Sequence, residues 1–309
     1  MNAADAYPHA TDLALVPFRF GADQSHARFV LTPDLGRHDG ALYGGAGAAA
    51  AVILMEAATQ RDALWVATQF VAQARLGDEI DVEARTLAAG KRIAQLQVVA
   101  HVDEEVIFTA LGATAHPRPN GLTGQYHEMP HAAPPDDSPP LQHGLRAPEV
   151  RELGFTCNLE FREAILSESD TRAMALWARL TPPQQEITPA GLAYLADMVP
   201  GAIARAAGKV GGGFSLDNAL RFAAMQPTEW VLLHLRGDVA THGYGHGSFT
   251  AWSSEGALLA TGSQTASMAH VFDGPDDPQI DEWRQSNERA ASQSDAAAST
   301  APAEGATRG

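Results

Sequence analysis

The sequence predicts an α+β fold made of two similar units, each with one long helix wrapped by an antiparallel sheet. An Ala-rich apolar stretch at residues 44–60 is followed by several strand-like segments, and a second helical stretch at residues 189–207 is followed by the same succession. Residues 46–55 are all apolar, so a helix formed by them must be covered on every side. A curled sheet would provide that cover, and two such units side by side could share one continuous sheet.

Alternating apolar residues and short turns define the strands of each unit. In the first unit the predicted strands are residues 63–74, 79–87, 92–102 and 106–115, with a turn at 103–105. In the second unit Thr188 is a good N-cap and Pro189 a good first-turn residue for the helix. The strands after that helix are predicted at residues 214–225, 228–237, 244–252 and 257–268, with a turn at 253–256.

The two units are related by a constant offset. Shifting the first by 151 positions, without gaps, superimposes the helices and the hairpin turns. Residues 77–115 share only 6 identities in 39 positions with residues 228–266, so the inference rests on order and spacing. An ordinary α+β domain without duplication is the alternative at this point.

Two segments differ in composition from the rest. Residues 117–148 hold 8 of the 19 prolines, which is typical of a linker or an irregular crossover. Residues 284–309 contain no Val, Ile, Leu, Met or aromatic residue, so they bury too little to offset the entropy lost on ordering. We therefore expect an N-terminal domain at 1–116, a linker at 117–148, a C-terminal domain at 149–283 and a disordered tail at 284–309.

Composition and charge exclude several classes of function. The 309 residues include 21 Lys and Arg against 37 Asp and Glu, a net charge of −16, which argues against a broad basic surface for nucleic acid or anionic lipid. The start lacks the basic and apolar regions of a signal peptide, and the longest apolar run, 46–55, is too short to span a bilayer. We expect a soluble, cytoplasmic protein with neither a nucleic-acid nor a membrane partner.

The single cysteine, Cys157, excludes an intramolecular disulfide and a four-thiolate zinc site, and is expected to be a buried small hydrophobe.

The offset also indicates a candidate site, because a duplicated fold needs to keep a site in only one copy. Asp197 in the second helix, Ser215 at the start of the next strand and Gln264 in the last strand are polar. Their counterparts at the offset are the apolar residues Ala46, Leu64 and Ala113. A carboxylate in an apolar helix is costly unless it is hydrogen-bonded, and the hydroxyl and the amide could supply those bonds. The alternative is that Asp197 reaches solvent and Ser215 caps a strand.

Six short motifs extend this comparison. The first half contains LYGG at 42–45 and ARLGDEIDVEARTLAAGK at 74–91. The second half contains YLAD at 194–197, FSLDNALRF at 214–222, TEW at 228–230 and ALLATGSQTASM at 257–268. In this order and spacing, over residues 12–270, the chain resembles the acyl-CoA thioesterase II family.

The resemblance implies a tandem (double) hotdog fold and the hydrolysis of acyl-CoA thioesters to free CoA and a carboxylic acid, a reaction of fatty acid metabolism. It implies no metal and no dissociable cofactor, an acyl-CoA as the substrate, and association into a homo-oligomer. It also implies a catalytic trio at the positions held here by Asp197, Ser215 and Gln264, which are the three residues that the offset comparison selects.

In such a site Asp197 would act as general base on a water held by Ser215 and Gln264. The thiolate leaves readily, so no strong general acid is needed. A free backbone N–H near a helix start, or at the kink expected from Pro200, would stabilise the oxyanion. Ser215 as an acyl-forming nucleophile is less favoured, because no His is placed next to it in the sequence.

Residues 217–222 depart from the family pattern. The family usually has Asp-His and an aromatic pair after its hydroxyl residue, whereas this chain reads DNALRF, with Asn218 in the place of the His. This leaves the acyl preference open. A non-catalytic module that binds acyl-CoA or lipid is the alternative function, because such a module would keep the pocket without needing the trio.

Other candidates receive ordinary structural interpretations. Glu56, in the first helix, is a weaker candidate base and is expected to reach solvent at the helix end. His242 and His246 are expected to be solvated residues of a turn or strand edge, because residues i and i+4 of a strand lie ~13 Å apart, too far for one metal ion. Residues 208–213, GKVGGG, are expected to form a flexible loop and not a phosphate cradle. Four cations are candidate contacts for CoA phosphates, although solvated surface is expected for each: Lys91, Arg92, Arg221 and Arg236.

Overall fold

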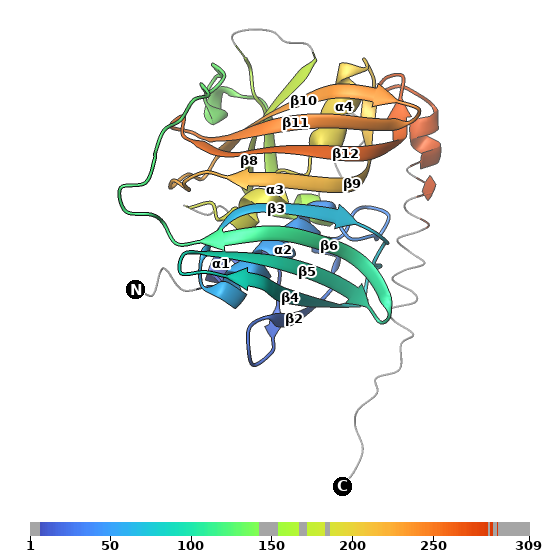
Figure 1. The fold of residues 1–309 in the computed structure, drawn as a ribbon. Helices are drawn as coiled ribbons and strands as arrows, with labels where there is room; N and C mark the ends of the chain where they lie inside the picture. The colour runs from blue at the N-terminus through green and yellow to red at the C-terminus, as the bar shows by residue number, and fades with distance from the viewer. Residues whose placement is uncertain are drawn as a thin grey trace.

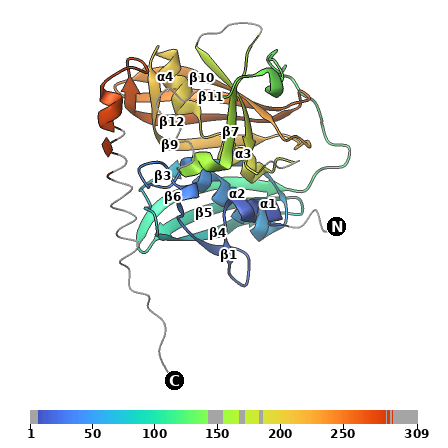
Figure 2. The same cartoon turned by 180° about the vertical axis from the view of Figure 1, so that it is seen from behind.

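The computed structural model of the chain describes residues 7–141, 154–166, 172–182, 186–283, 285, 286 and 289. These residues form one 12-stranded sheet in which every neighbouring pair of strands is antiparallel. Figure 1 shows the broad sheet in front and the helices behind it, and Figure 2, seen from the opposite side, shows the helices in front of the sheet. The predicted double hotdog fold is confirmed.

The first unit follows the predicted succession of a helix and a sheet. Its helices are α1 (Ala10–Leu15) and α2 (Gly44–Thr59), with the short 3₁₀ turn η2 (Pro33–Leu35) between them. Its strands are β1 (Arg19–Phe20), β2 (His26–Val30), β3 (Asp62–Phe70), β4 (Glu79–Ala89), β5 (Ile93–Val102) and β6 (Glu105–Ala115).

The second unit repeats this plan. After the turns η3 (Pro135–Asp137) and η5 (Gly154–Asn158) come the strands β7 (Leu159–Glu163) and β8 (Ala173–Leu180). The helices α3 (Pro189–Leu195) and α4 (Val199–Ala206) follow. The remaining strands are β9 (Val210–Phe222), β10 (Val231–Thr241), β11 (Tyr244–Ser253) and β12 (Leu258–Phe272).

The strand order shows the duplication directly. It runs β1-β2-β4-β5-β6-β3-β9-β12-β11-β10-β8-β7, so each strand of the first unit has a counterpart at the mirrored place in the second. Shifting β5 by the predicted offset of 151 gives residues 244–253, which are the bounds of β11. The units join where β3 pairs with β9, in a register centred on Ala67 opposite Ala219. That separation of 152 is within one residue of the offset, as expected for a twofold-like contact.

The helix α2 is enclosed as the sequence predicts. All its residues from Gly45 to Ala57 are buried, including the ten apolar residues 46–55. Alanine and glycine make this possible, because small side chains let the sheet and α3 approach closely. At Gly45 an added Cβ would lie 2.5 Å from the carbonyl oxygen of Tyr194 in α3. Tyr43 also donates from its hydroxyl to that oxygen, at 3.0 Å.

The second helix is not continuous. The stretch predicted at residues 189–207 is divided into α3 and α4 by a turn at residues 196–198. Thr188 caps α3 as predicted, because its Oγ1 accepts a hydrogen bond from the N–H of Gly191 at 2.9 Å. Pro200, in the first turn of α4, has no N–H to continue the helix, which confirms the expected break.

The glycine-rich segment that follows α4 was expected to be a flexible loop, and this is wrong for most of it. Only Gly208 and Lys209 lie outside regular structure, and β9 starts at Val210. Gly211 has a φ of +119°, and a Cβ at Gly211 or at Gly213 would collide with backbone atoms of β12. The glycines therefore allow close pairing beside an irregular register in β12.

The described part of the Pro-rich crossover, residues 117–141, runs from β6 to the outer face of the second unit (Figure 1). There Trp177 donates from its indole N–H to the carbonyl oxygen of Ala133 at 2.8 Å, and Met129 packs on a small core that contains Trp177 and Trp252. The proposed boundary between linker and second domain, at residue 148, lies outside the described residues. The expected tail at 284–309 lies almost wholly outside them as well.

Cys157 is exposed, so the expectation of a buried small hydrophobe is wrong. It lies in η5, a single turn that leaves the side chain on the outside while its neighbours Phe155 and Thr156 are buried. In the described part of the chain no helix has both the length and the apolar character needed to cross a membrane.

Candidate active site

Asp197 lies in the turn between α3 and α4 and is only 7% exposed. There its carboxylate meets the first turn of α2, where the backbone N–H of Gly45 donates to it. N–H groups in the first turn of a helix have no partner inside the helix, and the helix dipole favours negative charge at that end. The break in the second helix thus places an acidic side chain against the positive end of the first.

Three side chains of the sheet converge on the same carboxylate. Ser215 Oγ donates to Asp197 Oδ1 at 3.0 Å, and Asn218 Nδ2 donates to it at 3.3 Å. Gln264 Nε2 donates both to Asp197 Oδ1 and, at 2.7 Å, to Ser215 Oγ. Ser215 and Asn218 lie on β9 and Gln264 on β12, directly opposite Asn218 in the pairing of these strands. The structure therefore brings together the three residues that the sequence selected.

Asn218 is a fourth member that the sequence reasoning missed. It is fully buried, and its amide donates a hydrogen bond to the Asp197 carboxylate. In the sequence it stands out only as a departure from the family pattern. The offset comparison could have found it, because its counterpart at 151 positions is Ala67, the same change from polar to apolar that marked the other three.

Burial raises the pKa of Asp197 above its ordinary value, and the hydrogen bonds from Ser215, Gln264, Gly45 and Asn218 lower it again without cancelling the effect of burial. The carboxylate is therefore a stronger base than an exposed aspartate. A pKa raised toward the working pH suits a group that must take a proton during a reaction.

Gly44 is required next to this carboxylate. A Cβ at this position would lie 2.5 Å from Asp197 Oδ2 and 3.1 Å from the ring of Phe70. Gly44 also lines the cavity described next, so the absence of its side chain leaves both the carboxylate and the backbone of the first turn accessible.

A cavity of about 620 Å³ opens beside Asp197 and Ser215, both of which line it. Most of the wall is apolar and comes from both units: Tyr43, Phe70, Phe155, Met174, Pro200 and Phe214. Gln264 and Asn218 do not line it and stand behind the other two. An apolar cavity with a few convergent polar groups is typical of a small-molecule site.

Three cations line the cavity, and the sequence reasoning had selected none of them. They are Arg37, whose guanidinium lies 4.4 Å from the centre of the Phe214 ring, Arg205 and Lys209. The cations considered from the sequence lie elsewhere: Lys91 and Arg92 are in the loop between β4 and β5, and Arg221 and Arg236 line a separate hollow on the sheet.

The remaining candidates are also away from this cavity. His242 lies in the turn between β10 and β11 and His246 in β11, and both are exposed, as expected. Glu56, by contrast, was expected to reach solvent and is buried instead. It accepts a hydrogen bond from the N–H of Ala63 at 2.8 Å, and burial together with the nearby Asp12 raises its pKa to about 8. The reason for the error is that the segment containing α1 covers the end of α2 (Figure 2).

Comparisons with known proteins agree with the fold. The acyl-CoA thioesterase N-terminal domain matches residues 32–115, and the acyl-CoA thioesterase C-terminal domain matches residues 130–268. The chain belongs to the acyl-CoA thioesterase family. Membership supports thioesterase activity in general and an acyl-CoA as substrate.

Solved structures give the same picture. A proposed thioesterase from Novosphingobium aromaticivorans DSM 12444 is 29% identical, with a TM-score of 0.73, over 81% of this chain and 97% of that one. A protein of unknown function with a hot dog fold from Alicyclobacillus acidocaldarius is 21% identical (TM-score 0.71; 82% and 96% covered). The acyl-CoA thioesterase II TesB2 from Mycobacterium marinum is 18% identical (TM-score 0.64; 82% and 96% covered), so it supports the fold only. No curated protein matches the chain.

Replacement of Gly44 by alanine should damage the site more than the fold. The new Cβ would displace the Asp197 carboxylate, and misplacing a catalytic group by about 1 Å can cost ~10²-fold in rate. We expect Gly44→Ala to lower kcat for acyl-CoA hydrolysis by about that factor, measured by release of free thiol. Gly47→Ala is the matched control on the same helix, because its Cβ would have no neighbour nearer than 3.3 Å. Equal turnover in the two variants would contradict this interpretation.

Proposed function

We propose that the protein hydrolyses acyl-CoA thioesters to free CoA and a carboxylic acid, with Asp197, Ser215 and Gln264 acting on one water molecule. The observation that carries the proposal is the convergence of three side-chain donors on a buried carboxylate at the wall of a mostly apolar cavity. A carboxylate in such a position is costly for folding, which favours a role in the chemistry.

The reaction requires a base and a path for the proton. Asp197 takes one proton from the water as its oxygen attacks the thioester carbonyl carbon and forms a C–O bond. The tetrahedral intermediate then collapses, the C–S bond breaks, and the electron pair leaves with the thiolate of CoA. The thiolate takes the proton back from Asp197, which regenerates the carboxylate; where it takes a proton from solvent instead, Asp197 releases its own proton to solvent. No strong general acid is needed, because a free thiol has a pKa of about 8.5.

Ser215 and Gln264 position the water in this proposal. Ser215 Oγ lies on the cavity wall 3.0 Å from Asp197 Oδ1, so a water bonded to the hydroxyl would lie within reach of the carboxylate. Gln264 Nε2 fixes both groups at once, since it donates to each. Asn218 supports Asp197 from behind and does not reach the cavity.

The start of α2 is the proposed oxyanion site. Gly44 lines the cavity next to Asp197, and it stands at the first position of a 16-residue helix whose first N–H groups lack partners within the helix. Such N–H groups, together with the helix dipole, stabilise a developing negative charge. The glycine leaves room for the thioester carbonyl to approach them.

Two alternatives, a covalent mechanism and a non-catalytic binding function, predict different experimental results. Because Ser215 donates directly to Asp197, the hydroxyl could instead attack the thioester and form an acyl-enzyme. Rapid quenching followed by mass spectrometry would then find the acyl group on Ser215. A non-catalytic acyl-CoA-binding module would bind the substrate without releasing CoA at a rate above the uncatalysed one.

Replacement of Asp197 by asparagine should abolish most of the activity while the fold is kept. A neutral amide preserves the shape but cannot take a proton, and general-base catalysis contributes ~10²–10⁴-fold. We expect kcat for a good acyl-CoA substrate to decrease by a factor of ~10²–10⁴, measured by release of free thiol. Asp103→Asn, an exposed residue of the β5–β6 turn, should retain wild-type turnover.

The same assay tests the shared water. Ser215→Ala and Gln264→Ala should each lower kcat, and the double variant should lose less than the product of the two factors, because both residues position one water molecule. Near-normal turnover of Asp197→Asn would show that the base lies elsewhere. A wild-type protein that binds acyl-CoA and releases no CoA would support the binding module.

The acid limb of the pH profile should report the raised pKa of Asp197. The base must be ionised, so kcat/KM should fall as the pH decreases through a value above ~3.9, the ordinary pKa of an aspartate. Asn218→Ala removes a donor that lowers this pKa, so the limb should move to higher pH. Gln95→Ala is the control, because it changes an exposed residue of β5 away from the site. Any ionisation of the substrate affects both variants alike, so the acid limb should stay in place in Gln95→Ala. If the acid limb stays in place in Asn218→Ala, the ionisation that it reports is not that of Asp197.

We also propose a homo-oligomer at micromolar concentration. The sheet ends at β1 and β7, which have no further strand beside them in the described part of the chain, and such edges favour association. Light scattering should give a mass that is a multiple of 32.6 kDa. A mass of 32.6 kDa throughout that concentration range would exclude association.

A further inference from the structure

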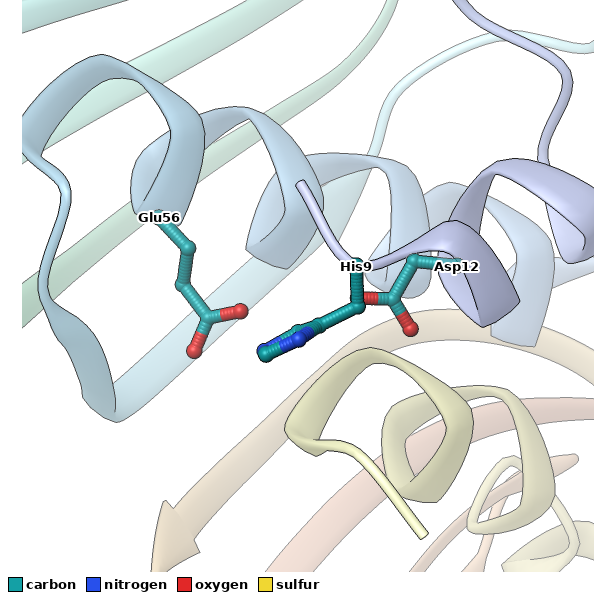
Figure 3. Close-up of side chains that lie close together, drawn as sticks. All are labelled: His9, Asp12 and Glu56. Carbon is teal, nitrogen blue, oxygen red and sulfur yellow. The ribbon is translucent and has the colours of Figure 1, made fainter. Parts of the chain in front are cut away.

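His9, Asp12 and Glu56 gather at the end of α2 that is remote from Asp197. His9 is the N-cap of α1, Asp12 lies in its first turn, and Glu56 lies in the last turn of α2. One ligand atom from each lies within 4.8 Å of the other two, and Figure 3 shows the three side chains turned toward one another.

Each carboxylate has one oxygen that accepts a hydrogen bond within the protein and one that has no such partner among the described residues. Asp12 Oδ1 accepts from the hydroxyl of Thr188 at 2.6 Å, and Glu56 Oε1 accepts from the N–H of Ala63 at 2.8 Å. Asp12 Oδ2 and Glu56 Oε2 are buried and have no hydrogen-bond partner among the described residues. Asp12 is 2% exposed and Glu56 is 1% exposed. Two buried oxygens of this kind are costly unless a proton or a cation lies between them.

We propose that His9, Asp12 and Glu56 bind one divalent transition-metal cation, which fastens α1 to the end of α2. The donor set of one imidazole nitrogen and two carboxylate oxygens suits Zn²⁺ and related ions, whereas Ca²⁺ and Mg²⁺ prefer oxygen ligands alone. The hydrogen bonds from Thr188 to Asp12 Oδ1 and from Ala63 to Glu56 Oε1 would fix the orientation of the two carboxylate ligands.

The spacing and the exposure of the cluster fit this role. With metal–ligand bonds of ~2.0–2.2 Å, ligand atoms lie about 3–4 Å apart, so only a small closure is needed from the present limit of 4.8 Å. His9 can provide it, because it is partly exposed at the end of a six-residue helix. The same exposure gives the ion access to a cluster whose carboxylates are buried.

The site would be structural and separate from hydrolysis. Glu56 lies twelve residues after Gly44 on α2, about 18 Å along the helix at ~1.5 Å per residue. Asp12 is bonded to Thr188, which caps α3, the helix that leads to Asp197. The bound ion would therefore stabilise the packing of three helices where the two hotdog units meet.

The test measures Zn²⁺ binding to the full chain, without a histidine tag and after removal of metals with a chelator. Isothermal titration should give one tight site per chain, with no comparable binding of Mg²⁺. His9→Ala and Glu56→Gln should each weaken this site at least tenfold. His26→Ala, which removes a histidine paired with Asp81 away from the cluster, should bind Zn²⁺ like the wild type.

A second readout separates binding from folding. Zn²⁺ should raise the Tm of the wild type and of His26→Ala, but not that of His9→Ala, which removes a partly exposed side chain and leaves both carboxylates in place. Should Glu56→Gln fail to fold, His9→Ala decides the question alone. The proposal is overturned if Zn²⁺ does not bind, in which case the two carboxylates share a proton instead. It is also overturned if Zn²⁺ binds His9→Ala with wild-type affinity.

Discussion

The Asp197 carboxylate is buried, and the surrounding residues must supply the hydrogen bonds that it would otherwise form with water. A charged oxygen that is removed from water needs several hydrogen-bond donors, and this one receives them from a helix start, two side chains of β9 and one of β12. No single segment supplies them all. The two units must therefore be held together accurately, because α2 belongs to the first unit and the other elements to the second.

The symmetric frame provides that accuracy, and local departures from symmetry provide the site. The continuous sheet fixes β9 against β3, and the small residues of α2 allow α3 to approach closely. In the first unit the equivalent position is Ala46, inside an unbroken helix that is buried from Gly45 to Ala57. In the second unit Pro200 interrupts the helix, and the resulting turn carries Asp197 to the boundary between the units. One proline and a few polar replacements are thus enough to distinguish the two copies.

Much of this arrangement could be predicted from the sequence, because it depends on patterns that repeat. Alternation and turns predicted the four strands that follow the long helix in each unit, and the constant offset selected Asp197, Ser215 and Gln264 as a polar set. What could not be predicted depends on contacts between distant segments. The burial of Glu56 results from a helix that begins at Ala10, and the position of Arg37 over Phe214 joins residues from the two units. The position of Cys157 depends on a single turn whose outward face no periodicity indicates.

The buried carboxylates of Asp197 and Glu56 show why burial alone does not identify the role of a residue. Both Asp197 and Glu56 have a raised pKa, and in both cases burial is the main cause. They differ in their neighbours: Asp197 faces donors and lines a cavity, whereas Glu56 faces a second carboxylate and an imidazole. Donors that converge on one oxygen stabilise an ionised carboxylate. Two carboxylate oxygens that converge with a ring nitrogen create a demand for positive charge. The same physical cost, the burial of a carboxylate, is therefore met in one hotdog unit by converging hydrogen-bond donors and in the other by an arrangement that suits a bound cation.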